Sequence, residues 1–302
     1  MDREPRAVRE RAGLAGLLAF REPDPAWIIG KNALLCLQVL QRGGRTEIDA
    51  VRRRIPYQWL GYQYQDHDDQ PFLVLHNSGG GFVENDSALL QIEAQPFTRL
   101  LVTTSAANKF YKCDTGGICR DEVEVSVGAG GLFEYLPDEA IPYAHSRIVR
   151  ATRINVAASA RVFASDTISA GRVNFGAGEL FAFDMLRSEF ELRIDGKLAV
   201  LDRQFAGTAE QVSAYEQLWG GYRHLSTIWA YAPDLPGGLE ERIHDVLHEI
   251  PESTAGVTRI GNVICVRILS VDAWHAHEGV YRVWEIARPA IAGKLARPIR
   301  KP

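Results

Sequence analysis

The sequence predicts a mainly β protein, built of stacked β layers in a β-helix-like arrangement with a few flanking helices toward the C-terminus. Two observations support the β body. Short runs rich in Val, Ile, Leu, Phe and Tyr recur from about residue 33 to 203, and glycine-containing turns separate them. A third observation supports the layers, because one strand–turn–strand unit recurs about every 30 residues.

The expected strands follow the apolar runs in chain order. They lie at 33–40, 71–76, 88–92, 99–104, 122–127, 132–136 and 147–156. Chain reversals are expected at the glycine-containing segments 79–81, 116–117, 128–131, 176–178 and 195–196.

Three segments of the β body align with one another: 92–103, 125–136 and 154–165. Each has a β-branched strand end, an interruption of about four small or turn-forming residues, and then an apolar strand. Residues 191–202 form a distant fourth copy. A unit of this period favours stacked layers, and the alternative is a sandwich whose hairpins resemble one another by chance.

After Arg203 the hydrophobic spacing becomes helical. Helices are expected at 208–219, 238–250 and 272–293, the last broken or ended near Pro289, with a strand at 261–269. No Ser/Gly/Pro-rich linker intervenes, so we expect a single domain over 31–302. It has a β body at about 33–205 and a mixed helical and strand flank at about 206–302. Residues 1–30 are expected to be a mobile appendage.

Composition excludes several classes of protein. The formal net charge of −4 gives no electrostatic basis for nucleic-acid binding, and no apolar stretch reaches membrane-spanning length. The N-terminal segment is basic, but Asp2, Glu4 and Glu10 interrupt it and no small-residue cleavage site follows, which argues against a signal peptide. Four cysteines in a chain of 302 residues fit reduced thiols, so we expect a cytoplasmic protein.

Two histidine pairs are candidate metal ligands. His244 and His248 are four residues apart on an expected helix, but the spacer lacks the Glu of a zinc protease motif, so a solvated face is favoured. His275 and His277 are two residues apart, and on a helix their side chains point in different directions.

Cys113 and Cys119 bracket a turn. Two thiolates with a flexible spacer can bind a soft ion, yet structural zinc sites contain two paired ligand sets and only one pair occurs here. The alternative is that both are small residues flanking a hairpin. No enzyme motif emerges from the residues themselves.

The glycine run 79–81 lacks the Lys and Ser or Thr of a phosphate-binding loop, and acidic Glu84 and Asp86 follow it. The longer segment GGGFVENDSALLQIEA-P-RLLVTTSAANKFYK (79–112) resembles the centre of the urease accessory UreD/UreH family. Further segments are similar to that family in the same order: GGRTEI (43–48), LFEYLPDEAIPY (132–143), SAGRVNFGAGELFAF (169–183) and IDGKLAVLDR (194–203). Together they cover about residues 33–205.

The chain departs from the family pattern at one turn. Glu84 and Asn85 stand where the family has Gly-Gly before Asp. If both positions need a positive φ, Asn tolerates it and Glu does so poorly.

The resemblance implies a non-catalytic scaffold with a β-helix-like fold. Members of the family join the F and G accessory proteins, of which G is a GTPase, on apo-urease and help to deliver nickel to its active site. The resemblance therefore implies these protein partners, no tightly bound cofactor, and Ni²⁺ in transit.

Asp86, Glu139 and Glu179 lie in three of the family-like segments and are the candidate nickel-path residues. Carboxylates can bind a divalent ion weakly enough to release it. The alternative is that each carboxylate caps backbone N–H groups at a turn.

Two other functions remain open from the sequence. The altered turn permits a homologous scaffold for another metalloenzyme. A carbohydrate-active enzyme on a β-solenoid would need a groove of aromatic and acidic residues. The available groups are Trp59, Tyr62 and Tyr64 near Asp66, Asp68 and Asp69.

Overall fold

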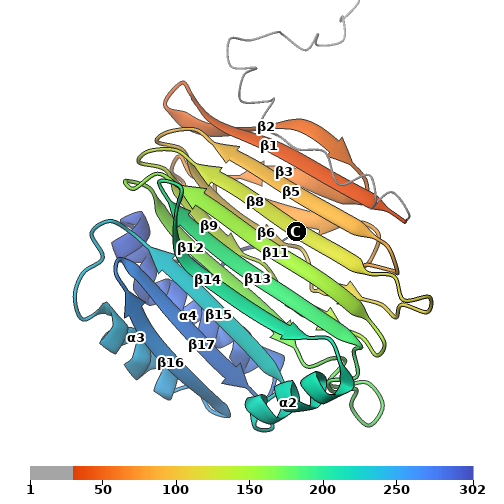
Figure 1. Cartoon of the computed structure of the whole chain (residues 1–302). Coiled ribbons are helices and arrows are strands. Elements are labelled where there is room, and N and C mark those ends of the chain that lie inside the picture. Colours follow the sequence, from red (N-terminus) through yellow and green to blue (C-terminus); the bar gives the residue numbers. More distant parts are fainter. Residues whose placement is uncertain (1–29, 302) are drawn as a thin grey trace, which may run out of the picture.

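A computed structural model describes residues 30–301, and the expected appendage at 1–30 lies outside this range except for Gly30. Two β-sheets lie face to face and helices cover the second sheet, which gives three layers (Figure 1). In the described part of the chain, no helix is long and apolar enough to span a membrane. The predicted mainly β fold with stacked layers is confirmed.

The first sheet has seven strands in the order β14-β13-β11-β8-β5-β1-β2. Its five central strands are parallel, whereas β2 and β14 are antiparallel edges. The strands are β1 (Asn32–Arg42), β2 (Arg45–Arg54), β5 (Ser87–Ala94), β8 (Cys119–Val127), β11 (Arg147–Val156), β13 (Met185–Ile194) and β14 (Lys197–Ala206).

The second sheet follows the order β16-β17-β15-β12-β9-β6-β4-β3, and β4, β6, β9 and β12 are parallel. The strands are β3 (Tyr57–Gln63), β4 (Phe72–Asn77), β6 (Arg99–Thr104), β9 (Leu132–Leu136), β12 (Arg161–Ser169), β15 (His224–Tyr231), β16 (Ser253–Ile260) and β17 (Val263–Ser270). Short strands β7 (Asn108–Phe110) and β10 (Ala140–Pro142) join it at the side.

The 30-residue repeat corresponds to the layers. In the first sheet Ile92 pairs with Val125, which pairs with Ile154. In the second sheet Leu132 pairs with both Arg99 and Arg161, so the aligned positions of the three copies are in register. Each copy therefore crosses once from the first sheet to the second.

The expectation that residues 191–202 form a fourth copy of the layered unit is wrong. Its strands β13 and β14 form an antiparallel hairpin within the first sheet. Asp195 (φ 48°) and Gly196 (φ 74°) both have positive φ, which suits a tight hairpin turn. The chain therefore returns along the same sheet at this point.

Three helices occur in residues 30–301: α2 (Ala209–Trp219), α3 (Leu239–His248) and α4 (Ala273–Ala292). Helices α3 and α4 pack on the second sheet and bury a second apolar core there, including Ile243 and Trp284. Strands β15, β16 and β17 extend the second sheet through the C-terminal region, where only one strand was expected.

Helix α4 runs past Pro289 to Ala292, although a break or an end near this proline was expected. Proline removes one backbone donor, but the Gly293 N–H still reaches the Pro289 carbonyl at 3.1 Å and closes the helix with a left-handed residue. Packing of Ala287, Ile291 and Ala292 in the core holds this last turn.

The triple glycine permits close approach of two chain segments. Gly81 has φ 144°, and a Cβ there would lie 2.6 Å from the Lys109 carbonyl oxygen. The next residue, Phe82, donates its N–H to that same carbonyl at 2.8 Å. In the turn that follows, only Asn85 has a positive φ (65°), so Glu84 is not strained.

Candidate functional site

Asp86 lies directly before β5 and its side chain is buried. Its carboxylate accepts hydrogen bonds from the backbone N–H of Lys31 (2.7 Å) and of Val83 (3.0 Å), and the Lys31 ammonium lies 3.6 Å away. These contacts close the 83–86 turn and attach it to the start of β1 (Asn32–Arg42). The geometry matches the capping alternative for Asp86.

Glu179 lies in the loop before β13 and is engaged in a similar way. It pairs with Arg172 and accepts a hydrogen bond from the Ala144 N–H at 2.9 Å. The hydrogen bond from Arg172, followed by that from Ala144, lowers the pKa of Glu179 below its ordinary value. The Arg172 guanidinium also lies over the rings of Tyr143 and Phe175.

Glu139 differs from the other two candidates because it faces imidazoles. Its Oε2 lies 3.4 Å from Nε2 of His277 on α4 and 3.9 Å from Nδ1 of His224 at the start of β15. Neither Glu139 Oε2 nor His224 Nδ1 has a hydrogen-bond partner in the described chain, although both are buried. We call Glu139, His224 and His277 the Glu139 cluster.

Charge and burial set the protonation of the Glu139 cluster. Burial opposes ionisation of Glu139, but the contact with His277 and the nearby imidazoles outweigh it and lower the Glu139 pKa. Contact with the Glu139 carboxylate raises the pKa of His277. Burial lowers the pKa of His224, so this imidazole is neutral near pH 7 and its nitrogen is free to bind.

Two imidazoles and one carboxylate are donors that Ni²⁺ and Zn²⁺ accept. Two ligand atoms bound to one ion at about 2.1 Å lie roughly 3.0–3.4 Å apart, depending on the coordination geometry. The Glu139–His277 separation of 3.4 Å fits that range, and the His224 separation of 3.9 Å is somewhat longer. The arrangement favours weak binding of a metal ion over the closed coordination of a structural metal site.

Asp86, Glu139 and Glu179 do not form one cluster. Their hydrogen bonds and ion pairs involve separate partners, and none joins two of the three within residues 30–301. Sequence reasoning missed His224, because an isolated histidine at the start of a strand gives no signal of its role.

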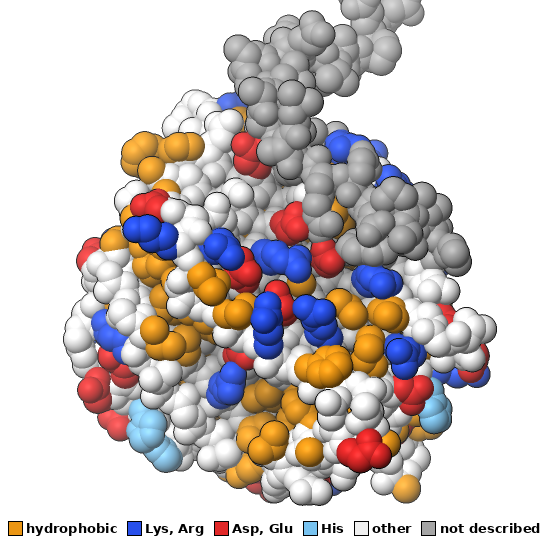
Figure 2. All heavy atoms as spheres, in the orientation of Figure 1, with side chains coloured by type: hydrophobic (Ala, Val, Ile, Leu, Met, Phe, Trp, Pro, Cys, Tyr) orange, Lys and Arg blue, Asp and Glu red, His pale blue; other side chains and the backbone are white. Residues whose placement is uncertain are grey.

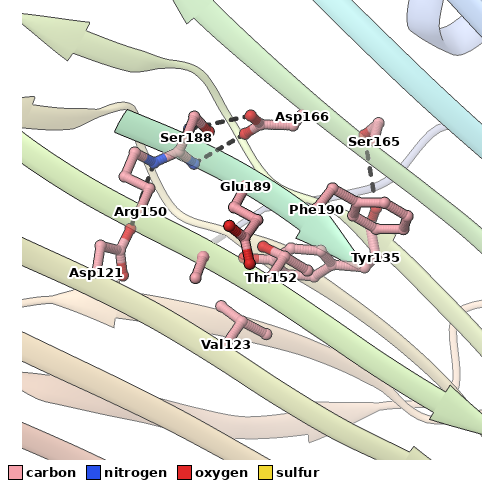
Figure 3. A pocket seen from close by; sticks show the side chains of 11 residues that line it. Asp121, Val123, Tyr135, Arg150, Thr152, Ser165, Asp166, Ser188, Glu189 and Phe190 are labelled. Atoms are coloured by element: carbon pink, nitrogen blue, oxygen red, sulfur yellow. Dashed lines mark hydrogen bonds and ion pairs between the residues drawn. The ribbon is translucent and has the colours of Figure 1, made fainter. Parts of the chain in front are cut away.

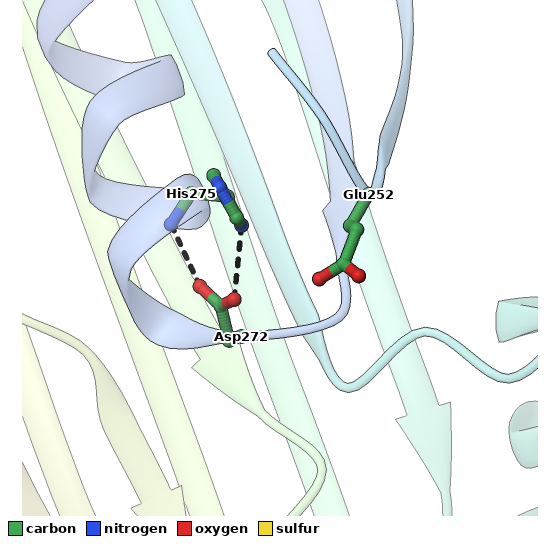
Figure 4. A group of neighbouring side chains, drawn as sticks. All are labelled: Glu252, Asp272 and His275. Carbon is green, nitrogen blue, oxygen red and sulfur yellow. Dashed lines mark hydrogen bonds and ion pairs between the residues drawn. The ribbon is translucent and has the colours of Figure 1, made fainter.

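A second group of donors lies nearby, at the N-terminus of α4 (Figure 4). Ligand atoms of Glu252, Asp272 and His275 lie within 4.8 Å of one another. Asp272 is the helix cap, because its Oδ1 accepts the His275 N–H at 2.9 Å and its Oδ2 lies 2.9 Å from His275 Nδ1. Figure 4 shows Glu252 on a separate strand end, apart from this bonded pair.

The histidine pairs follow the expectations from spacing. His275 turns to Asp272 and His277 turns to Glu139, so the two do not share a site. His244 and His248 are exposed on α3 with their Nε2 atoms 3.1 Å apart, and they belong to no group of three ligands in the described residues.

The interior between the two sheets contains a polar cavity of about 10 Å³, enough for one water molecule (Figure 3). Arg150 lies beside it and binds both oxygens of Asp166, at 2.8 and 3.1 Å. Asp121 lies 3.9 Å from Arg150 and accepts the Tyr57 hydroxyl at 2.7 Å. The Arg150 guanidinium is therefore held between two carboxylates beside this cavity.

The aromatic and acidic residues that are candidates for carbohydrate binding make contacts within the protein. Trp59 stacks on Tyr62, and the Tyr64 hydroxyl donates to the Thr46 carbonyl. The acidic residues are paired: Asp66 with Arg288 and Lys294, Asp68 with Lys294, and Asp69 with Arg99. Such pairing leaves no carboxylates arranged for glycoside hydrolysis in this group.

The outward face of the first sheet is charged with both signs interspersed (Figure 2). Ion pairs run across its strands, including Arg203 with Glu189 (2.7 Å) and Arg153 with Glu122 (3.6 Å). A surface of this kind gives no net basic patch.

Comparison with known proteins identifies the family. The model of the UreD urease accessory protein family matches residues 31–301. The chain belongs to the UreD family. The chain is 30% identical to the urease accessory protein UreD of Pseudomonas putida (strain W619), over 94% of this chain and 98% of that one. It is 25% identical to urease accessory protein UreD 2 of Brucella abortus (strain 2308), over 90% and 92% of the two chains.

The resemblance seen in residues 33–205 is thereby confirmed, and the match extends it through the C-terminal helices. Glu84, the residue that departs from the UreD pattern, makes contacts that hold the structure together here. Glu84 accepts hydrogen bonds from Thr115 N (3.0 Å), from the Thr115 hydroxyl (2.8 Å) and from Gly117 N. The altered turn therefore fastens a neighbouring loop.

Proposed function

We propose that this protein is a non-catalytic maturation scaffold for urease in the cytoplasm. It binds apo-urease together with the F and G accessory proteins and assists nickel delivery to the urease active site. The observation that supports this proposal is the match to the UreD family over residues 31–301. That match also favours urease over another metalloenzyme as the client.

Within that function, nickel makes contact with the Glu139 cluster. Glu139 is the one sequence-predicted carboxylate whose oxygen has no hydrogen-bond partner, and it faces two imidazoles. Asp86 and Glu179 are held by backbone amides and basic groups, so each supports its own turn. These two residues therefore contribute to nickel delivery by stabilising the fold.

Reconstitution tests both parts of this proposal. Apo-urease, the F and G accessory proteins and this chain are co-expressed and isolated by affinity capture. Urease activity is then measured after addition of nickel, bicarbonate and GTP, with and without the chain. Co-elution and chain-dependent activation support the scaffold, whereas no association and no activation contradict it.

The Glu139→Gln variant tests the nickel contact. It keeps the side-chain size but removes the charge, and we expect at least about tenfold slower activation with unchanged co-elution. Glu189→Gln is the control, because Glu189 also has a low exposed fraction (7%, against 13% for Glu139) but is paired with Arg187 and Arg203 on the outer face. Equal activation by both variants would exclude a specific role for Glu139.

A further inference from the structure

Two cysteine thiols touch beneath an exposed loop, and the proposed nickel contact does not use them. Cys113 follows β7 and Cys119 begins β8, and their Sγ atoms are 4.0 Å apart. Both residues are buried, but residues 114–116 between them are exposed. The pair therefore lies just below the surface of the protein.

Hydrogen bonds make the two sulfurs unequal. The Cys113 and Cys119 thiols are in hydrogen-bond contact, in which either sulfur can be the donor, and the Arg147 backbone N–H donates to Cys113 Sγ. The contact with Cys119, followed by the Arg147 N–H, lowers the pKa of Cys113. The same contact and burial raise the pKa of Cys119, which also lies 3.3 Å from the Val83 carbonyl. Cys113 is the thiol that ionises first.

The other two cysteines lack this environment. Burial raises the pKa of Cys36 and of Cys265 to about 11 in each case. Cys265 is more exposed than Cys113, so exposure alone favours reaction at Cys265 and the thiolate fraction favours reaction at Cys113. The two criteria give opposite predictions that an experiment can separate.

The loop between the cysteines, residues 114–118, belongs to no strand, so a change in its shape breaks no strand pairing. Gly116 and Gly117 lie at its tip, and Gly116 has a φ of 83°. The loop is fastened from outside by the Glu84 carboxylate through Thr115 and Gly117. A shift of about 2 Å would bring the sulfurs from 4.0 Å to bonding distance.

We propose that Cys113 and Cys119 form a thiol–disulfide exchange site for small disulfides of the oxidised glutathione class. The Cys113 thiolate attacks one sulfur of the disulfide, and one glutathione thiolate leaves. Cys119 then loses its proton and attacks Cys113 Sγ, releasing the second glutathione. The two protein thiols lose two electrons and the small disulfide gains them. This site is independent of the proposed role in urease maturation.

The wild-type full-length chain tests the proposal without any substitution. It is incubated with oxidised glutathione at pH 7, free thiols are blocked with N-ethylmaleimide, and peptides are mapped by mass spectrometry. We expect a cross-link between Cys113 and Cys119 that dithiothreitol reverses, formed at least about tenfold faster than any adduct at Cys265. A glutathione adduct at Cys265 with Cys113 and Cys119 unmodified would overturn the proposal.

Single substitutions assign the two roles. Cys119→Ser is expected to stop at a stable glutathione adduct on Cys113, and Cys113→Ser to abolish reaction at both positions. Cys265→Ser is the control and is expected to react as wild type. If the purified protein instead retains zinc and the pair reacts only after chelation, the site is a metal site and the exchange proposal is wrong.

Discussion

Glu134 and Arg288 form a fully buried ion pair that joins the last helix to the second sheet. Glu134 lies on β9, and its Oε1 is 3.1 Å from Arg288 Nε on α4. The second oxygen accepts the Gln70 amide at 2.7 Å, and Arg288 also reaches Asp66 at 2.7 Å. Both Glu134 oxygens and all three Arg288 nitrogens have hydrogen-bond partners, so the cost of desolvating the pair is largely compensated.

Removal of one partner should therefore be costly. Arg288→Met leaves Glu134 buried without its cation, and we expect the free energy of unfolding to fall by about 3–5 kcal/mol. Urea denaturation followed by circular dichroism measures this change. The double variant Arg288→Met/Glu134→Gln should recover part of the loss. A double variant as unstable as the sum of both single variants would show that the pair is not coupled.

Asp86→Ala should destabilise the protein by removing a cap from two backbone amides. The Lys31 and Val83 N–H groups would lose a charged acceptor, at a cost of about 3 kcal/mol in the free energy of unfolding. Lys31→Gln is the control, because its half-exposed ammonium contributes less than about 1 kcal/mol. Unchanged stability of Asp86→Ala with lost urease activation would instead place Asp86 on the nickel path.

The stacked layers were predictable because the repeat in the sequence is the register of the sheets. Ile92, Val125 and Ile154 align in the sequence and pair in the structure. The fourth copy was misleading, because a hairpin turn at Asp195-Gly196 uses the same strand–turn–strand pattern. Local pattern does not distinguish a return within one sheet from a crossing to the other.

The candidate site was only partly predictable. Glu139 was identified through the family-like segment, but its imidazole neighbours come from β15 and α4, far along the chain. Burial of His224 and its distance from Glu139 are tertiary properties with no local sequence signal. The same holds for Glu134 and Arg288, which are 154 residues apart.

The Glu139 cluster should bind nickel with a characteristic pH dependence. Contact with Glu139 raises the pKa of His277, so a proton competes with the metal and nickel binding should strengthen as pH rises through that pKa. His277→Gln should flatten this dependence between about pH 6 and pH 8. Calorimetric titration with Ni²⁺ measures it, with His244→Gln on α3 as the control. If His277→Gln keeps the wild-type pH dependence of nickel binding, the His277 imidazole is not a nickel ligand.

The ion pair between Glu139 and His277 should also stabilise the fold. This stabilisation should weaken as pH rises, whereas nickel binding should strengthen. A histidine with a raised pKa in the folded state contributes its stabilisation below the unfolded pKa and loses it as pH rises through the folded pKa. Without metal, wild type should therefore exceed His277→Gln in stability at acidic pH and approach it at higher pH. The His277 side chain is half-exposed, so we expect the difference in the free energy of unfolding to be less than about 1 kcal/mol. Chemical denaturation at pH 5.5 and 8.5 compares the two, and a difference that grows with pH would contradict this assignment.

The isolated chain should self-associate through an exposed apolar edge. Strand β14 is an edge of the first sheet, and its Leu201 and Phe205 are 41% and 57% exposed. An edge strand with exposed apolar side chains favours pairing with another chain. Leu201→Ser/Phe205→Ser should raise the monomeric fraction in sedimentation velocity, whereas Leu295→Ser, which removes an exposed leucine after α4, should not. A wild-type chain that stays monomeric at high concentration would contradict this prediction. The charged neighbours Asp202 and Arg203 would then be sufficient to prevent pairing at the β14 edge.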